Sequence, residues 1–515
     1  MTTRTTTARV EGVPARNHAE HVRGPRVSLA SEGPAGDLSA VIVGGGITGL
    51  AAAYHLARDC RRLGLPASIT LLEGAPRFGG KIQTTHRDGF VLEAGPDSFV
   101  ARKQAAVALV RELGLAHRLM PTAGEHRRVL MLHDGELIEL PSGLGLVAPA
   151  ELSALFATPL LSPWGKLRAC LDLVLPARPA EGDESLGSFV RRRLGRQMLE
   201  RVVAPLLSGI HGTDPEELSL QSTFPAFAEM ERRHGSLIRG VQAARRDASP
   251  SATSARLTLE GGLGELVEAL TARLADDGVA LVAGRRAAGL ERRADGGWTI
   301  ALEDGPRLAA DAVVLTTPPL ATAELLQPLD RKLAWQLYQI RHASIATVSL
   351  GFRAEDLPRP LSAYGFVAPR REGRRITACT FTSTKLAHRA PEGKVLLRAF
   401  LGGPDDGHVL RRSDAELVRA VLYDLRAVLG TSAPPVLAEV HRFEGGSPQY
   451  RVGHAERVAR IENRLPEGLS LAGCAYHGVG IPDCLESGAA AAGHAFERLV
   501  ERSRWALRAR ASGGG

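Results

Sequence analysis

Aromatic residues, lysines and cysteines are all scarce in this sequence, and the first shortage already says something about packing. Aromatics make up 4% of the 515 residues, whereas 44% of the residues are apolar and 56 are glycine. A chain of this size can bury a large core and should divide into two or three domains. The composition favours closely packed helices and many turns.

The cysteines are few and show no spacing typical of a site. There are five, an odd number, with no CxxC pair, and no HExxH occurs. This pattern argues against a disulfide framework and a structural zinc site, and it indicates a reducing compartment. We therefore expect a cytoplasmic protein without a metal. The cysteines are Cys60, Cys170, Cys379, Cys474 and Cys484.

Long apolar runs are also missing. None approaches the roughly 18 residues of a membrane span. Residues 1–37 lack apolar periodicity and an apolar signal region, so we do not expect a secretory signal. Glu11, Glu20 and Glu32 argue against a transit peptide. A disordered extension over 1–37 and a disordered basic tail over 501–515 are the expectation.

The net charge of +8 comes almost entirely from arginine, since lysine is rare. The arginines alternate with acidic residues, as in "ERRHGSLIRGVQAARRDASP". This indicates a solvated surface and no nucleic-acid partner. A pocket for an acidic small molecule stays open.

A glycine turn near the N-terminus predicts a dinucleotide site. "VIVGGGITGLAAAYHLA", residues 41–57, reads as a strand, a GxGxxG turn and a helix. The glycines permit the turn and the close approach of a pyrophosphate, which the helix N-terminus then binds. The next strand, "ASITLLE", ends in Glu73, which is placed for a ribose hydroxyl. The turn residues are Gly44, Gly45, Gly46, Ile47, Thr48 and Gly49.

The loop after Glu73 distinguishes between dinucleotides. "GAPRFGGKIQTTHRDGFVLEAGPDSF" places Arg77, Gly79 and Gly80 directly after the acidic residue. It resembles the flavoprotein oxidases of the amine-oxidase and desaturase group, where this loop wraps FAD. Arg77 is expected to meet the pyrophosphate, and FAD is favoured over NAD.

The middle of the chain changes character twice. Residues 106–245 are mostly helical, with a predicted cap at Ser185, and 151–175 reads as a core helical pair broken at Ser162-Pro163. An alternative for 151–175, centred on Trp164, is a surface that meets a membrane. Strand patterns dominate 320–440, which we expect to line a substrate cavity.

These patterns predict an α/β fold with two domains and an inserted helical lobe. A Rossmann-like FAD-binding domain is expected in three parts, and a mixed-sheet domain binds the substrate. The FAD-binding parts are 38–105, 246–319 and 441–500; the helical lobe with part of the substrate domain is 106–245, and the rest of the substrate domain is 320–440.

A second glycine turn lies more than four hundred positions after the first. "GCAYHGVGIPDCLESGAAAAG", residues 473–493, again leads from a strand into a helix of small residues. No second acid-ended strand follows, so both turns are predicted to serve one long ligand. The first holds the pyrophosphate, and the second presents a helix N-terminus to the flavin ring, where it stabilises negative charge.

Six motifs together resemble the oxygen-dependent protoporphyrinogen/coproporphyrinogen oxidases of haem synthesis, most of all the soluble bacterial coproporphyrinogen III branch. They are "GGGITGLAAAYHL", "RFGGKIQT", "EAGPDSF", "APLLSGIHGTDPEELSL", "ITACTFTS" and "GVGIPDCLESG". The resemblance spans about 38–500. It implies that non-covalent FAD takes a hydride from a porphyrinogen and that O2 reoxidises it to give hydrogen peroxide. A downstream chelatase is an implied partner, and no catalytic side chain is expected.

The resemblance also assigns residues. Lys103 would meet a substrate propionate, with Arg102 beside it as a further substrate candidate, and Gly209 would leave room for the macrocycle or cap a helix. Phe443 stands where relatives carry Trp. Positions implied to contact FAD are Gly44 to Gly49, Glu73, Arg77, Gly79, Gly80, Lys81, Gly95, Pro96, Asp97, Ser98, Ala287, Phe443, Val479, Gly480 and Ile481.

Alternatives remain open. An amine oxidase or carotenoid desaturase has the same fold, although the C-terminal turn offers only Tyr476 where amine oxidases pair two aromatics. A flavin scaffold without turnover is another. Protoporphyrinogen IX has two propionates and coproporphyrinogen III four, but the sequence alone does not identify Arg102, Arg341 or Arg398 as pocket residues.

Overall fold

The computed structural model describes residues 38–124, 128–141, 143–145, 147–178, 182–247 and 256–512. The predicted disordered extension over 1–37 lies outside these residues. No helix in the described part of the chain is long and apolar enough to cross a membrane.

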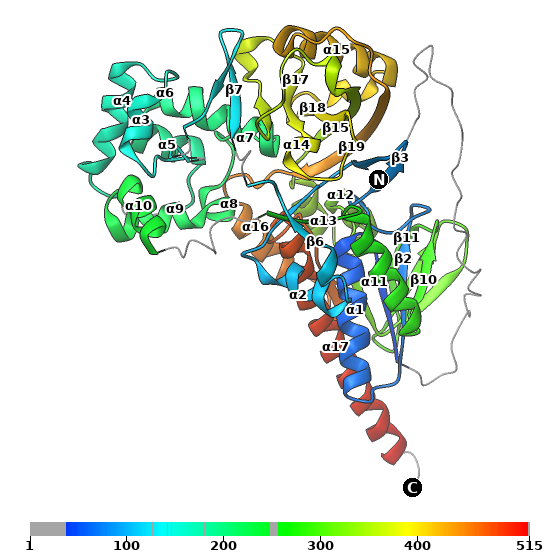
Figure 1. The fold of residues 1–515 in the computed structure, drawn as a ribbon. Helices are drawn as coiled ribbons and strands as arrows, with labels where there is room; N and C mark the ends of the chain where they lie inside the picture. The colour runs from blue at the N-terminus through cyan, green and yellow to red at the C-terminus, as the bar shows by residue number, and fades with distance from the viewer. Residues whose placement is uncertain are drawn as a thin grey trace.

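A five-stranded parallel sheet forms the base of the molecule (Figure 1). As predicted, the first strand along the chain leads into the glycine turn and the helix after it, and the second strand ends at Glu73. Both long helices of small residues, α1 (Ile47–Arg62) and α17 (Ile481–Ser512), pack on it side by side, with α11 (Gly264–Asp276) next to α1. In spatial order the strands are β10 (Ala280–Ala283), β2 (Ala67–Glu73), β1 (Leu38–Val43), β14 (Ala312–Leu315) and β20 (Leu469–Leu471).

The other face of this sheet is covered by an antiparallel sheet and three helices. They share one apolar core with Val41, Val43 and Leu72. The covering elements are β11 (Ala287–Arg292), β12 (Trp298–Leu302), β13 (Arg307–Ala310), α12 (Pro319–Leu326), α13 (Arg331–Tyr338) and α16 (His454–Glu462).

Short elements carry the chain out of this domain and back. They are β3 (Thr84–Arg87), β4 (Phe90–Glu93), β5 (Phe99–Val100), α2 (Gln104–Glu112), β6 (Leu119–Pro121) and β9 (Arg256–Leu259). β9 pairs with both β5 and β6.

A seven-stranded mixed sheet forms the upper part of the molecule, with α14 (Thr382–Lys385) beside it. One face packs its apolar side chains against α15 (Asp414–Leu429), whose start has a capping box of Ser413 and Glu416. Alternation along the strands places Thr347, Arg398 and His441 on the other face. The strand order is β19 (Leu437–Pro448), β15 (His342–Arg353), β18 (Lys394–Gly403), β17 (Ile376–Phe381), β16 (Gly365–Val367), β7 (Val129–His133) and β8 (Glu136–Glu139).

A helical lobe projects from the side of this sheet (Figure 1). The predicted breaks are present: Ser162 caps α4 with Pro163 in its first turn, and Ser185 caps α5. Buried Arg193 pairs with buried Asp172 in the lobe core. The helices are α3 (Leu152–Ala157), α4 (Pro163–Cys170), α5 (Leu186–Leu194), α6 (Arg196–Met198), α7 (Ala204–His211), α8 (Leu220–Thr223), α9 (Pro225–His234) and α10 (Leu237–Asp247).

The mixed α/β architecture agrees with the prediction, but three segments differ from it. Residues 501–512 are helical, so the predicted disordered tail is wrong as far as Ser512; Arg502 anchors this stretch to Asp311 at 2.9 Å. β19 pairs with β15 in the seven-stranded sheet, although 441–448 was predicted with the FAD-binding domain. Conversely, α12 and α13 pack against the parallel sheet of the FAD-binding domain, although 320–440 was predicted to belong to the substrate domain. Long-range pairing decided these placements, and local pattern does not encode it.

Candidate cofactor and substrate site

The β1–α1 turn is built so tightly that only glycine fits. Gly44 has φ +111°, and a Cβ on Gly49 would lie 1.8 Å from the Gly44 carbonyl oxygen. No side chain caps the start of α1 at Gly46. The first N–H groups of the helix are therefore free to bind an anion such as a pyrophosphate.

Glu73 lies at the end of β2 beside this turn, where a ribose contact was predicted. Its carboxylate accepts hydrogen bonds from the backbone N–H groups of Gly45 and Ala75, each at 2.7 Å. The Arg285 N–H donates to the Glu73 carbonyl at 3.0 Å, and this brings Ala287, two residues further on, to the same edge. The structure thus places Ala287 two residues beyond a backbone contact with Glu73, and its contact with an adenine stays a prediction.

The loop containing Gly79 and Gly80 lies directly on the first turn. Gly79 N–H donates to the Gly45 carbonyl at 2.8 Å, and both loop glycines have positive φ. The Arg77 guanidinium, predicted to meet the pyrophosphate, makes its hydrogen bonds within its own loop. It donates to the carbonyls of Phe78, Gly80 and Ile82 and to Gln83 Oε1, so it holds the loop in shape. Burial lowers its pKa.

Lys81, next in this loop, is the cation that points across the site. Its Nζ lies 3.2 Å from Cys474 Sγ in the second turn. Lys81 therefore links the two glycine turns and is free to meet negative charge on a ligand between them.

The "EAGPDSF" segment is clamped to the seven-stranded sheet. Asp97 accepts from Lys385 Nζ at 2.7 and 2.8 Å and from Arg398 at 2.9 Å, and Ser98 Oγ donates to it at 2.7 Å. Burial by itself would raise the pKa of Asp97, but Lys385 and Arg398 hold it far below its usual value. Asp97 and Ser98 thus belong to a network of ion pairs and hydrogen bonds that fixes this segment to Lys385 and Arg398.

Gly95, before Pro96, lies between Lys81 and Phe443. A Cβ there would be 2.1 Å from the Lys81 carbonyl oxygen and 3.7 Å from Phe443 Cζ. Phe443, on β19, therefore brings an aromatic ring close to the same loop.

The second turn needs supports that sequence reasoning missed. Tyr450 Oη donates to the Cys474 carbonyl at 2.7 Å and accepts from Gly478 N–H at 2.8 Å. His454 stacks on the Tyr450 ring at 4.0 Å, and its Nε2 contacts the Tyr476 carbonyl at 3.1 Å. No local sequence pattern marks this pair, because Tyr450 lies before the start of α16 and reaches the second turn through tertiary contacts.

The start of α17 carries the remaining predicted residues. Gly480 N–H donates to Asp483 at 3.0 Å, Val479 is exposed and Ile481 is buried. A Cβ on Gly488 would lie 2.4 Å from the Thr48 carbonyl oxygen, so α17 and α1 touch near their N-termini. The structure brings the two turns together, as one shared ligand requires.

The predicted substrate residues are placed differently. Lys103 forms an ion pair with Asp483, and Arg102 is exposed. A Cβ on Gly209 would meet Val367 Cγ1 at 2.6 Å, so this glycine lets α7 approach β16. The alternative, a helix C-cap, belongs to Gly212 with φ +59°.

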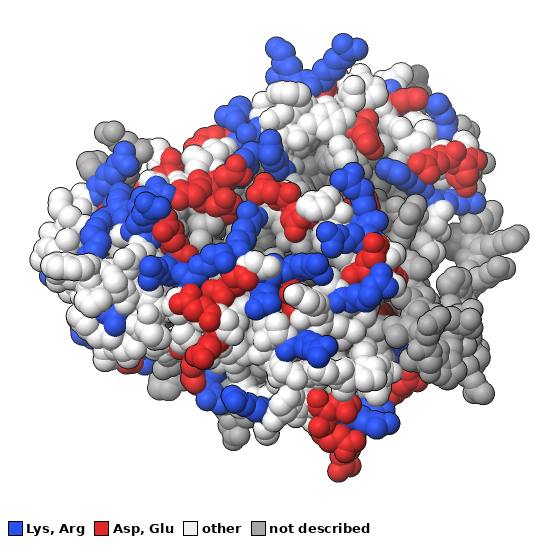
Figure 2. All heavy atoms as spheres, turned by 90° about the horizontal axis from the view of Figure 1, so that it is seen from above, with Lys and Arg blue, Asp and Glu red and all other residues white. Residues whose placement is uncertain are grey.

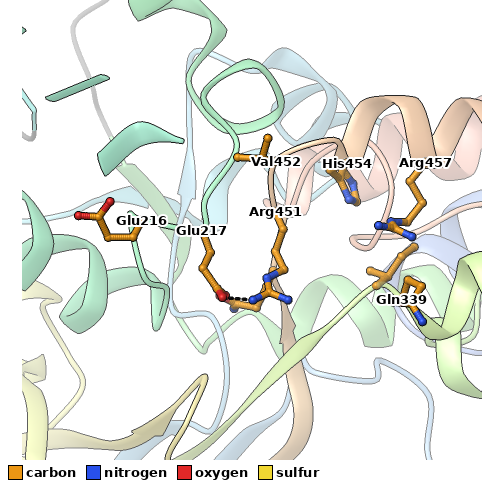
Figure 3. A pocket seen from close by; sticks show the side chains of 9 residues that line it. Glu216, Glu217, Gln339, Arg451, Val452, His454 and Arg457 are labelled. Carbon is orange, nitrogen blue, oxygen red and sulfur yellow. Dashed lines mark hydrogen bonds and ion pairs between the residues drawn. The ribbon is translucent and has the colours of Figure 1, made fainter. Parts of the chain in front are cut away.

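A polar cavity of about 310 Å³ lies beside the second turn (Figure 3). Arg451 forms an ion pair with Glu217 across it. Arg457 donates to Gln336 at 3.3 Å and has no carboxylate partner among the described residues; burial lowers its pKa, as do Arg460 and Arg451. The lining residues are Glu216, Glu217, Gln339, Ile340, Gln449, Arg451, Val452, His454 and Arg457.

On the face seen in Figure 2, basic and acidic side chains alternate and form no stripe of one sign.

Comparison with known proteins assigns the chain and its fold to a family. The family described as flavin containing amine oxidoreductase matches residues 47–495. Coproporphyrinogen III oxidase of Bacillus subtilis (strain 168) is 38% identical over 467 residues, covering 89% of this chain and 98% of that protein. Protoporphyrinogen oxidase of Bos taurus is 33% identical, covering 88% and 97%.

A crystal structure from Exiguobacterium sp. 255-15, assigned provisionally as a protoporphyrinogen oxidase, superposes with a TM-score of 0.80. It is 35% identical and the match covers 89% of this chain and 99% of that one. The uncapped α1, the glycine cradle and Glu73 fit a flavin dinucleotide. The chain belongs to the flavin-containing amine oxidoreductase family, among its porphyrinogen oxidases, and its cofactor is a flavin.

Proposed function

We propose that this protein oxidises coproporphyrinogen III to coproporphyrin III in haem biosynthesis, with non-covalent FAD as hydride acceptor and O2 as final oxidant, releasing hydrogen peroxide. The observation that carries the proposal is the 38% identity to a coproporphyrinogen III oxidase across nearly its whole length. The convergence of two glycine turns on one ligand site supports it.

Each part of the site has a role in this proposal. The free N–H groups of α1 hold the pyrophosphate, and the Glu73 carboxylate exchanges its backbone partners for ribose hydroxyls. Lys81 adds positive charge between the turns. When bound, the flavin accepts a hydride from a methylene bridge of the porphyrinogen while a pyrrole N–H loses a proton. The chain has only to orient the substrate and exclude water.

The cavity supports an anionic substrate. Arg457 has no carboxylate partner among the described residues and lies with Arg451 beside the second turn, so we assign it to a propionate. Arg398, one of the three arginines considered from sequence, is buried on Asp97 and is not a substrate cation. Four propionates on coproporphyrinogen III make more use of such cations than two.

The amine-oxidase alternative finds little support. Tyr476, the aromatic residue that could have formed part of a cage, is buried in the apolar core under the parallel sheet. If the protein were a flavin scaffold without turnover, no porphyrin would form. If it were a carotenoid desaturase, it would oxidise polyenes.

Protoporphyrinogen IX is the second candidate substrate, and an exposed apolar patch favours it. Trp164 is 78% exposed, and Leu167 and Leu171 follow at helical spacing. We propose that this patch gives a cytoplasmic protein weak contact with a membrane surface. The patch is Phe156, Trp164, Leu167, Leu171 and Val174. Co-sedimentation with anionic vesicles tests it: Trp164→Ser should weaken binding, and Trp335→Ser, at a tryptophan 62% exposed on α13, should not.

The deciding experiment follows porphyrin fluorescence in air with freshly reduced coproporphyrinogen III or protoporphyrinogen IX. We expect faster growth with the first substrate, dependent on flavin and accompanied by peroxide, and product available to a downstream chelatase. Faster growth with protoporphyrinogen IX would instead assign the enzyme to the formation of protoporphyrin IX. No growth above flavin-free protein would refute both. Acid precipitation should release all the flavin as FAD, which tests the non-covalent attachment.

A further inference from the structure

Five buried charged side chains meet where the "EAGPDSF" segment contacts the seven-stranded sheet, and their charges are unequal in number. Lys385 and Arg398 share the carboxylate of Asp97, with Lys385 Nζ at 2.7 Å and an Arg398 nitrogen at 2.9 Å. Arg389 lies 3.9 Å from the carboxylate of Glu93. No side chain of the five is more than 12% exposed. This group, called the cation cluster below, sets three positive charges against two negative charges away from water.

The cation cluster is joined to the wall of the candidate cofactor site. Arg398 donates hydrogen bonds to the carbonyls of Glu93 and Gly95, each at 2.8 Å. Gly95 packs so closely on the neighbouring loop that a Cβ on it would lie 2.1 Å from the Lys81 carbonyl oxygen. Lys81 Nζ in turn lies 3.2 Å from Cys474 Sγ in the second turn. One hydrogen bond and one backbone contact therefore separate the Arg398 guanidinium from the residue that links the two glycine turns.

The two carboxylates do not balance the three cations. Burial by itself would raise the pKa of Asp97, but Lys385 and Arg398 hold it far below its usual value, so Asp97 already supplies its full negative charge. Burial raises the pKa of Glu93 to about 7, so near neutral pH this second carboxylate is charged only part of the time. A buried charge without a partner is costly, because it has lost its hydration and salt screens it little. A negatively charged group in the adjoining cofactor site would lower that cost.

We propose that the cation cluster stabilises the negative charge that the bound flavin gains on reduction. A hydride carries two electrons and one proton, so a flavin that accepts it gains one negative charge. Two unit charges about 10 Å apart, at an effective dielectric constant of about 20, alter an equilibrium roughly tenfold. Lys385 and Arg398 act through this field and transfer no proton, so they are positioning residues for the charge on the cofactor.

The proposal rests on the flavin that the family binds and not on the porphyrinogen substrate. It adds buried side-chain charges to the N-terminus of α17, which the sequence assigns to the same negative charge on the flavin ring. Because the reduction potential of the flavin is measured without substrate, failure of the coproporphyrinogen assay leaves the cation cluster testable. Failure of the cation cluster leaves the proposed substrate unaffected.

The test is an anaerobic reductive titration of the flavin-loaded protein against a reference dye, which gives the midpoint potential. Lys385→Met removes a cation and should disfavour the reduced flavin about tenfold, which is about 30 mV more negative for a two-electron couple. Asp97→Asn removes an anion and should shift the potential by a similar amount in the positive direction. The double variant loses one charge of each sign and should lie close to the wild-type potential.

Further variants separate the effect of charge from that of packing. Lys385→Arg keeps the charge and should keep the wild-type potential, and Lys332→Met, exposed on α13, should leave the potential unchanged. Circular dichroism and the amount of retained flavin confirm that each variant is folded. If Asp97→Asn does not retain flavin, the comparison of Lys385→Met with Lys385→Arg decides the matter. Shifts of the same sign in Lys385→Met and Asp97→Asn, or a potential that Lys385→Met does not change, would overturn the proposal.

Discussion

Both glycine turns line the candidate cofactor site, but different interactions fix their conformations. The first, at Gly44 to Gly49, stands on its own: glycine conformations, an uncapped helix and Glu73 at the next strand end are enough. The second, around Gly473 to Gly480, is supported from outside by Tyr450, His454 and Lys103. A turn made by local backbone geometry is visible in sequence, whereas a turn held by tertiary contacts is not.

The largest effect should come from breaking the first turn. Gly49→Ala places a Cβ 1.8 Å from a backbone oxygen that cannot move away, and we expect a loss of about 3 kcal/mol or more with little retained flavin. Thermal unfolding and flavin absorbance per protein measure it. Gly493→Ala in α17 is the matched control, since nothing lies within 4 Å of its Cβ position; it should be neutral or stabilising by up to about 1 kcal/mol. Equal behaviour of the two would contradict the structure.

Acid should weaken the second turn first. Burial lowers the pKa of His454 from 6.5 to about 4. A depressed folded pKa means that the neutral imidazole contributes stability fully above pH 6.5, and that this is lost as pH falls towards 4. The loss of stability amounts to about 3 kcal/mol. Burial also lowers the pKa of His342. Urea unfolding between pH 7 and 4 should show a shallower decline for His454→Gln, and an unchanged slope would count against this assignment.

Removing one hydroxyl should loosen the second turn alone. Tyr450→Phe deletes the hydrogen bonds to Cys474 and Gly478 at a cost of about 1 to 2 kcal/mol, and flavin should dissociate faster. Tyr423→Phe, exposed on α15, is the control and should have no effect. Stopped-flow flavin release measures the difference. If Tyr450→Phe released flavin at the wild-type rate, the second turn would not need this support.

The smallest effect concerns the cavity beside the second turn. Arg457→Gln should raise KM for coproporphyrinogen III about fivefold, with less change for protoporphyrinogen IX and little change in kcat. Arg460→Gln, exposed on the same helix, should leave KM unchanged. Steady-state fluorescence assays measure both variants. A fall in kcat with unchanged KM would place Arg457 outside the substrate contacts.

Sequence reasoning succeeded where a few adjacent residues decide the structure. The glycine turn after the first strand, the acidic end of the second strand at Glu73, the helix cap at Ser185 and the helix break at Ser162-Pro163 were all predictable. It failed where the folded backbone around a residue decides what that residue contacts. Arg77 looked like a phosphate ligand, but its donors are satisfied by its own loop. Gly209 looked like space for a macrocycle, but it is a contact between helix and sheet.

What the sequence determined by itself is the cofactor class and the family, because glycine spacing and an acid at a strand end are local requirements of dinucleotide binding. What only the tertiary structure decided is the composition of the second half of the site. Tyr450, Lys81 and Cys474 meet through contacts between segments up to about four hundred residues apart. Such contacts depend on how sheets and helices pack, and packing leaves no mark in the spacing of neighbouring residues.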